Sequence, residues 1–350
     1  SQGLGATTPH PTMHLVLAFA GFITLGHPGL VLTVLTVGAL PIGWWGAARL
    51  SAAIVSEPAG GSRDALRDRV QVVAAFAYAA IPLPYAALST GRLSVLVGYA
   101  SLPWLLHMMR AFGEISDSRD SATAGIRSPR LRLISGLTLV MAVVLAFSPA
   151  VALMALLSAL VLLVFTAIAP GGTRMTARGF GALVVAFAGA VVLNLPWVTR
   201  YLASDGWRAL VGGGEAGDRS LLTLMRFGLA PVALGGLIIA VYAPVIVAPL
   251  VARDTRFAWA LRAAGLTVVG IGVAVIGEGR HAPFALPEAG VLLLPVAVGL
   301  AIGVANMVAV FASDVRGGRF GWRQPLSIIA IVVSALGVLP VAAVAANGSY

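Results

Sequence analysis

The chain has 350 residues, of which 59% are hydrophobic and only 10% are charged, and its mean hydropathy is +0.96. About a quarter of the residues in an ordinary soluble domain are charged, so 23 basic and 13 acidic side chains are too few to coat two soluble domains. The composition therefore excludes an ordinary soluble protein and favours a protein whose solvent is the lipid bilayer. The complete absence of Cys also excludes disulfides and thiolate metal sites.

The first 28 residues are expected to form an extracytoplasmic segment with a short helix at the membrane interface. The apolar run at 12–26 has about 15 residues, which rise only about 22 Å as a helix, whereas the hydrocarbon core is about 30 Å thick. The chain starts at Ser1 without Met, and residues 347–350 follow an apolar run directly. We therefore expect a piece of a longer protein, with residues 347–350 as a second extracytoplasmic segment.

Residues 29–346 are predicted to form one polytopic membrane domain. Charged or Pro/Gly-rich breaks divide this region into ten apolar windows of roughly 20 residues, the length of a spanning helix. The fold class is accordingly all-α, a membrane helix bundle of about ten transmembrane helices. The predicted spans are 29–53, 70–89, 93–112, 131–147, 150–169, 180–198, 232–252, 257–277, 291–312 and 326–346.

The distribution of Arg predicts the orientation of the bundle. The sequence has no Lys, and its 23 Arg residues lie in short groups between the apolar windows, 17 on one side of the ten-span arrangement and 6 on the other. Because cytoplasmic loops are enriched in basic residues, the 17 are placed inside. The chain is thus predicted to be a multi-pass protein of the plasma (inner) membrane with both of its ends extracytoplasmic, and the net charge of +10 is attributed to topology rather than to nucleic-acid binding.

Few polar residues lie inside the predicted spans. Arg49, His107 and Arg262 lie near the predicted cytoplasmic ends of their helices, where extension of the side chain to the interface explains them. Asn194 and Asn306 are uncharged and are predicted to bond a neighbouring helix rather than a ligand. We therefore expect any functional site at an aqueous face, with no metal and no cofactor held by this chain.

Two outer loops, 199–231 and 278–290, are the candidates for such a site. In the second loop, Arg280 and His281 are suitable donors to a phosphate, and Glu278 is placed to orient the Arg or to act as a base. Arg92 and Arg200 add cations at the same predicted face. The alternative interpretation of 278–290 is a solvated connector without a ligand.

Three stretches of the sequence resemble a known family. They are GLGATTPHP at 3–11, the run RVQVVAAFAYAAIPLPYAALSTGRLSVLVGYASLPWLL at 69–106, and FGWRQPLS at 320–327. Together they resemble the membrane region of large actinobacterial glycosyltransferases that carry a family 2 nucleotide-sugar transferase domain before it. This region is more distantly similar to polytopic glycosyltransferases of the GT-C type, which take sugars from polyprenyl-phosphate donors at the extracytoplasmic face.

The resemblance implies a function and also a departure from the pattern of GT-C enzymes. In those enzymes a catalytic Asp precedes a helix like 12–26, whereas this chain has no acidic residue before Glu57. The resemblance therefore places the catalytic acid outside this chain, unless the region has no transferase chemistry of its own.

The expected function is that of a membrane module of a cell-envelope glycosyltransferase that acts with a polyprenyl-phosphate-linked sugar at the extracytoplasmic face. Its expected partners are membrane lipids, the polyprenyl-phosphate lipid and the missing N- and C-terminal parts of the same protein, with no nucleic acid. The alternatives are a translocase for lipid-linked sugars and a non-catalytic membrane anchor for soluble glycosyltransferase domains.

Overall fold

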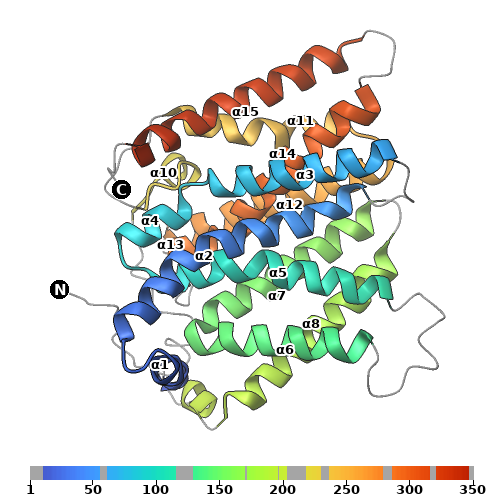
Figure 1. Cartoon of the computed structure of the whole chain (residues 1–350). Coiled ribbons are helices and arrows are strands. Elements are labelled where there is room, and N and C mark those ends of the chain that lie inside the picture. The colour runs from blue at the N-terminus through green and yellow to red at the C-terminus, as the bar shows by residue number, and fades with distance from the viewer. Residues whose placement is uncertain are drawn as a thin grey trace.

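The computed structural model describes residues 11–55, 61–115, 129–169, 172–195, 197–202, 218–229, 236–278, 286–315 and 321–346. Across these ranges the regular structure is entirely helical. Nine long helices run roughly alongside one another, and shorter helical segments lie among them (Figure 1). The long helices are α2 (Pro28–Ser51), α3 (Gly61–Ala79), α5 (Leu93–Ile115), α6 (Pro129–Phe147), α7 (Pro149–Ile168), α8 (Thr173–Leu193), α12 (Asp254–Glu278), α14 (Leu294–Val310) and α15 (Arg323–Ala346).

The shorter segments lie mainly between the long helices, and several of them are 3₁₀ turns. The α-helical ones are α1 (Pro11–Ile23), α4 (Leu83–Ser89), α10 (Leu221–Met225), α11 (Ala243–Val251) and α13 (Ala289–Leu292). The 3₁₀ segments are η1 (Ala52–Val55), η3 (Trp197–Leu202) and η4 (Gly236–Tyr242), and η5 (Phe311–Val315) is a π-helical turn. We call the end of the bundle that holds α4, α10 and α13, on the left of Figure 1, the α13 end.

Eight helices of the described part are long and apolar enough to cross a membrane, so the chain is a multi-pass membrane protein. These candidates are Gly29–Val55, Asp64–Ser89, Pro129–Phe147, Pro149–Ile168, Thr173–Leu193, Asp254–Glu278, Ala289–Ser313 and Arg323–Val344. They confirm eight of the ten spans expected from the sequence. The break at Ser148-Pro149 is also confirmed, because α6 ends at Phe147 and α7 begins at Pro149.

The other two of the ten predicted windows are not among these eight candidates, which were sought in the described residues alone, so they stay predictions. The window 93–112 forms α5, a 23-residue helix whose hydropathy is lowered by His107, Arg110 and Glu114 near its end. The described residues of the window 232–252 form η4 followed by α11, a shorter apolar stretch at Gly236–Val251. Its geometry changes at Ala243, directly before Pro244, which lacks the backbone N–H of a regular helix.

A short helix is present where the sequence indicated one. α1 packs against α2 and α6, and Figure 1 shows it end-on while those two helices lie across the view. Phe19, Phe22 and Ile23 on this helix expose most of their side chains. Its location at the membrane interface stays a prediction.

α14 lies at the centre of the bundle. Of its spanning window, 89% is buried inside the protein, against 28–50% for the other seven candidates. It packs against α12, α3 and α11, and small residues permit the close approach. A Cβ added to Gly299 would lie 2.8 Å from the carbonyl oxygen of Ala263 on α12, so this helix pair packs backbone against backbone.

Buried polar side chains in the helices bond to backbone carbonyl groups. Tyr78 and Tyr99 stack with ring centroids 4.2 Å apart, and each hydroxyl donates to the other residue's carbonyl oxygen at 2.9 Å. The Asn194 amide donates to the carbonyl oxygen of Ala142 on α6 at 3.2 Å, and that of Asn306 donates to the carbonyl oxygen of Arg256 on α12 at 3.0 Å. The prediction that both Asn side chains bond a neighbouring helix is confirmed.

Helices α5 and α8 cross closely through a reciprocal pair of glycines. A Cβ on Gly113 of α5 would overlap the carbonyl oxygen of Met175, and a Cβ on Gly179 of α8 would overlap that of Met109. Both obstacles are backbone atoms, which cannot move aside without shifting a helix. The crossing therefore fixes the ends of α5 and α8 relative to each other.

This crossing generates a stability prediction. Gly179→Ala should lower the free energy of unfolding in detergent by about 1–3 kcal/mol, the usual cost of overpacking. The matched control is Gly181→Ala on the same helix, where a Cβ would have no neighbour within 4 Å. Alanine has a higher helix propensity than glycine, so the control substitution should leave the free energy of unfolding unchanged or raise it. Equal unfolding free energies for the two variants would contradict the proposed crossing.

Candidate functional site

Of the five candidate residues, two are described with their side chains. Arg92 lies in the turn before α5, and Glu278 is the last residue of α12. Arg200 belongs to η3, and its side chain is outside the described part of the protein. Arg280 and His281 lie within 279–285, outside the described residues, so their contacts stay predictions.

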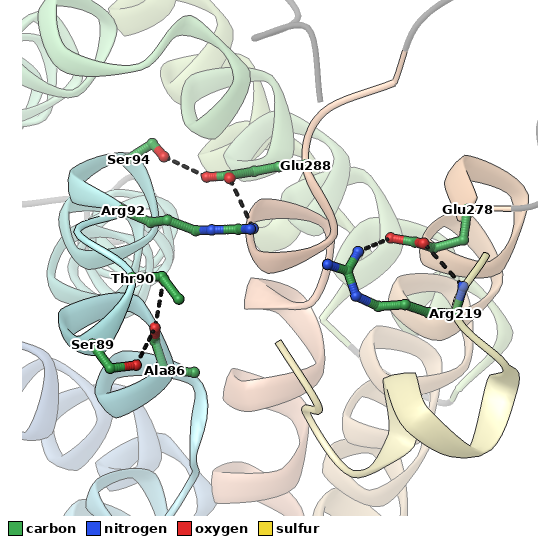
Figure 2. Close-up of polar contacts among 8 residues, drawn as sticks. All are labelled: Ala86, Ser89, Thr90, Arg92, Ser94, Arg219, Glu278 and Glu288. Carbon is green, nitrogen blue, oxygen red and sulfur yellow. Dashed lines mark hydrogen bonds and ion pairs between the residues drawn. The ribbon is translucent and has the colours of Figure 1, made fainter. Parts of the chain in front are cut away.

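Arg92 is held at the α13 end by a carboxylate from a distant segment. Its Nη1 lies 3.1 Å from Oε2 of Glu288, and the hydroxyl of Ser94 donates to Oε1 of the same carboxylate at 2.6 Å (Figure 2). The preceding turn is shaped by Gly91, whose φ of +68° is easily adopted only without a side chain. Glu288 directly precedes α13, so this contact joins the starts of α5 and α13.

Glu278 is paired with Arg219, which lies 59 positions earlier in the sequence. Its carboxylate, only 6% exposed, accepts from Nη1 of Arg219 at 2.8 Å and from the Arg219 backbone N–H at 3.3 Å (Figure 2). The sequence predicted that Glu278 would orient Arg280 or act as a base. Among the described residues, its bonds come from Arg219, just before α10, and its contact with Arg280 stays a prediction.

The two ion pairs flank the segment that carries Arg280 and His281. Glu278 comes immediately before 279–285, and Glu288 follows it by a few residues. α13 packs against α5 and α12, and α10 packs against α12, so both pairs belong to the same end of the bundle. Each carboxylate balances one guanidinium charge, so Arg92 and Arg219 offer an incoming anion less attraction than isolated cations would.

None of the three comparisons with known proteins gives a match: no family model, no curated protein and no solved structure is significantly similar to this chain. The family resemblance therefore rests on the sequence patterns at 3–11, 69–106 and 320–327 alone. Function has to be argued from the chemistry of the two ends of the bundle. Among the described residues, no group of three or more His, Asp or Glu side chains could hold a metal ion.

Sequence reasoning overlooked a second polar cluster at the opposite end, where α6, α8 and α12 begin. A cavity of about 320 Å³ lies there, with Arg110, Glu114, Thr166 and Arg262 among its lining residues. Arg262 had been explained by extension of its side chain toward the interface, but its Nε donates to the hydroxyl of Thr166 at 2.9 Å. The two residues are 96 positions apart, and no local sequence pattern connects them.

The two ion pairs at the α13 end should differ in strength. Glu278 is nearly buried, so its coupling to Arg219 should be that of a charge-assisted hydrogen bond, about 1.5–3 kcal/mol. Glu288 and Arg92 are 24% and 30% exposed, which favours the value for a surface pair, about 0.2–1 kcal/mol. Double-mutant cycles with Arg219→Ala and Glu278→Gln, and with Arg92→Ala and Glu288→Gln, measure both. A weaker coupling for the Arg219 pair would contradict the burial seen here.

Proposed function

We propose that this chain is the membrane module of a cell-envelope glycosyltransferase and that its α13 end binds the phosphate of a polyprenyl-phosphate-linked sugar. The proposal rests on the two ion pairs on either side of 279–285, the segment that contains Arg280 and His281. Glu278, directly before this segment, binds Arg219, and Glu288, three residues after it, binds Arg92. A loop anchored on both sides holds its side chains with less loss of conformational entropy on binding.

The chemistry of a lipid phosphate fits the end of a bundle rather than its middle. A phosphate buried in hydrocarbon without partners would cost several kcal/mol, so the lipid keeps it at headgroup depth while its chain lies along apolar helices. Large apolar side chains are exposed on the outer faces of the helices, among them Val34, Phe76, Leu139 and Ile329. These faces provide the apolar contact that a polyprenyl chain requires.

Roles within the candidate site follow from the ion pairs. Arg92 is paired with Glu288, and Glu278 is paired with Arg219, so we assign both residues a structural role on either side of 279–285. The phosphate contacts are assigned to Arg280 and His281, with Arg200 as a further cation at the same end. Arg can bond two phosphate oxygens at once, and a protonated His can donate one more bond.

The orientation of the bundle is part of the proposal. In the ten-span arrangement expected from the sequence, the bias of 17 Arg to 6 favours an α13 end outside the cell, where polyprenyl-phosphate sugars serve as donors in enzymes of the GT-C type. We assign no catalytic acid to this chain, because the GT-C pattern places that acid before the first short helix and no acidic residue precedes Glu57 here. The module then binds and positions the lipid donor rather than transferring the proton itself.

A second candidate function is that of a non-catalytic membrane anchor. It is favoured by the same ion pairs, because Arg92 and Arg219 both stabilise contacts within the chain. A translocase for lipid-linked sugars has less support. Such a protein needs a polar route between helices, whereas Tyr78, Tyr99 and Asn194 direct their donors at backbone carbonyls.

The experiment separates the lipid-binding module from the anchor. Arg280→Ala should weaken binding of polyprenyl monophosphate to the full-length protein by at least about tenfold, because a charge-assisted bond contributes about 1.5–3 kcal/mol. Arg208→Ala, in the loop 199–231, is the matched control and should bind almost normally. Binding is measured by native mass spectrometry in a detergent without phosphate, at equal expression. Unchanged binding in both variants would contradict the proposal and favour the anchor.

A further inference from the structure

The cavity at the end where α8 and α12 begin is built from six segments of the chain. The segments α2, η1, α5, α7, α8 and α12 surround about 320 Å³, near the lower limit of volumes that hold a small ligand. Leu106, Leu162 and Trp259 contribute to its apolar walls. The remaining lining includes three charged side chains, two Arg and one Glu. Its position is opposite to the proposed lipid site, so the two sites are independent.

Arg262 is fixed in a single orientation at this cavity. Its guanidinium carbon lies 4.7 Å from the ring centroid of Trp259, and its Nε donates to the Thr166 hydroxyl. That hydroxyl in turn donates to the carbonyl oxygen of Leu162, so its own proton is already used. Within the described residues, Nε is the only nitrogen of Arg262 that has a hydrogen-bond partner. No other described residue occupies the two terminal nitrogens, which we assign to a ligand.

Arg110 supplies a second cation to the same cavity. It pairs with Glu114 one turn later on α5, its side chain is 21% exposed, and its Nε is buried with no hydrogen-bond partner. The charged lining therefore has one more positive than negative charge. Two guanidinium groups around one small cavity repel each other, and an anion between them removes that repulsion.

The start of α8 adds backbone donors to the two cations. Gly172, at the N-cap with φ +90°, lines the cavity and has no side chain to accept from the first amides of this 21-residue helix. A Cβ on Gly172 would lie 3.8 Å from Nη2 of Arg262, so the helix start and the guanidinium are close neighbours. The first amides of an α-helix lack partners in their own helix, and the positive end of the dipole attracts anions.

We propose that this cavity binds a phosphate group, held by Arg262, Arg110 and the N-terminus of α8. A tetrahedral anion with several acceptor oxygens matches a guanidinium with free terminal nitrogens on one side and backbone amides on the other. The single surplus positive charge matches a singly charged phosphate, whose P–OH group can donate a hydrogen bond to the Glu114 carboxylate. The phosphate is carried either by a lipid headgroup or by a soluble molecule.

The test uses the full-length protein in dodecyl maltoside, a detergent without phosphate. One arm titrates inorganic phosphate by calorimetry, and the other adds phosphatidic acid and measures retained lipid by native mass spectrometry. Binding in the first arm alone assigns the site to a soluble phosphate, and binding in the second alone assigns it to a lipid. Arg262→Gln, which keeps most of the side-chain stem but not the charge, should weaken binding at least about tenfold in the responding arm.

Two further variants keep the test decisive. Arg132→Ala removes an exposed Arg of α6 at the same end of the bundle and should bind normally. Arg262→Lys keeps the charge and should recover part of the affinity, which a purely structural role for Arg262 would not predict. The proposal is overturned if the unsubstituted protein binds neither probe, or if Arg262→Gln binds as tightly as Arg132→Ala.

Discussion

Hydrocarbon offers no water to a buried polar group, and this constraint determines where the polar chemistry of the molecule lies. Helices provide hydrogen-bond partners for the backbone N–H and C=O groups. The buried side chains of Tyr78, Tyr99, Asn194 and Asn306 donate hydrogen bonds to backbone carbonyl oxygens. Ion pairs, in contrast, are found at the ends of the bundle, as between Arg219 and Glu278. The middle of the bundle is left for packing, and the ion pairs of the described residues lie at its two ends.

Packing between the helices depends on small residues that allow close approach, because apolar side chains are no less favourable in contact with lipid than in contact with each other. Gly299 brings α14 against α12, and Gly113 and Gly179 bring α5 against α8. The second crossing also shapes a cavity, because Met109 and Met175 at the crossing line the cavity that contains Arg110 and Arg262. The geometry of this cavity is therefore set by close backbone contacts between the ends of α5 and α8.

Much of the fold could be predicted from the sequence, but less of the polar chemistry. Apolar windows of the right length located eight spans, but they did not indicate the change from 3₁₀ to α-helix at Ala243, because hydropathy does not distinguish these helix types. The ion pairs join residues 59 and 196 positions apart, as Arg219 with Glu278 and Arg92 with Glu288. These partners meet because α10, α12 and α13 pack together, and the sequence contains no periodic pattern that indicates this packing.

The central claim is that the two polar ends face opposite sides of the membrane, with the Arg-rich end in the cytoplasm. Because the chain has no Cys, single substitutions Ser118→Cys and Ser220→Cys give a clean readout with a membrane-impermeant thiol reagent on intact cells. Ser220 precedes α10 at the α13 end, and residue 118 lies in the connection between α5 and α6. We expect labelling at position 220 and none at 118 until the cells are lysed. Labelling at 118 with protection of 220 would contradict the claim.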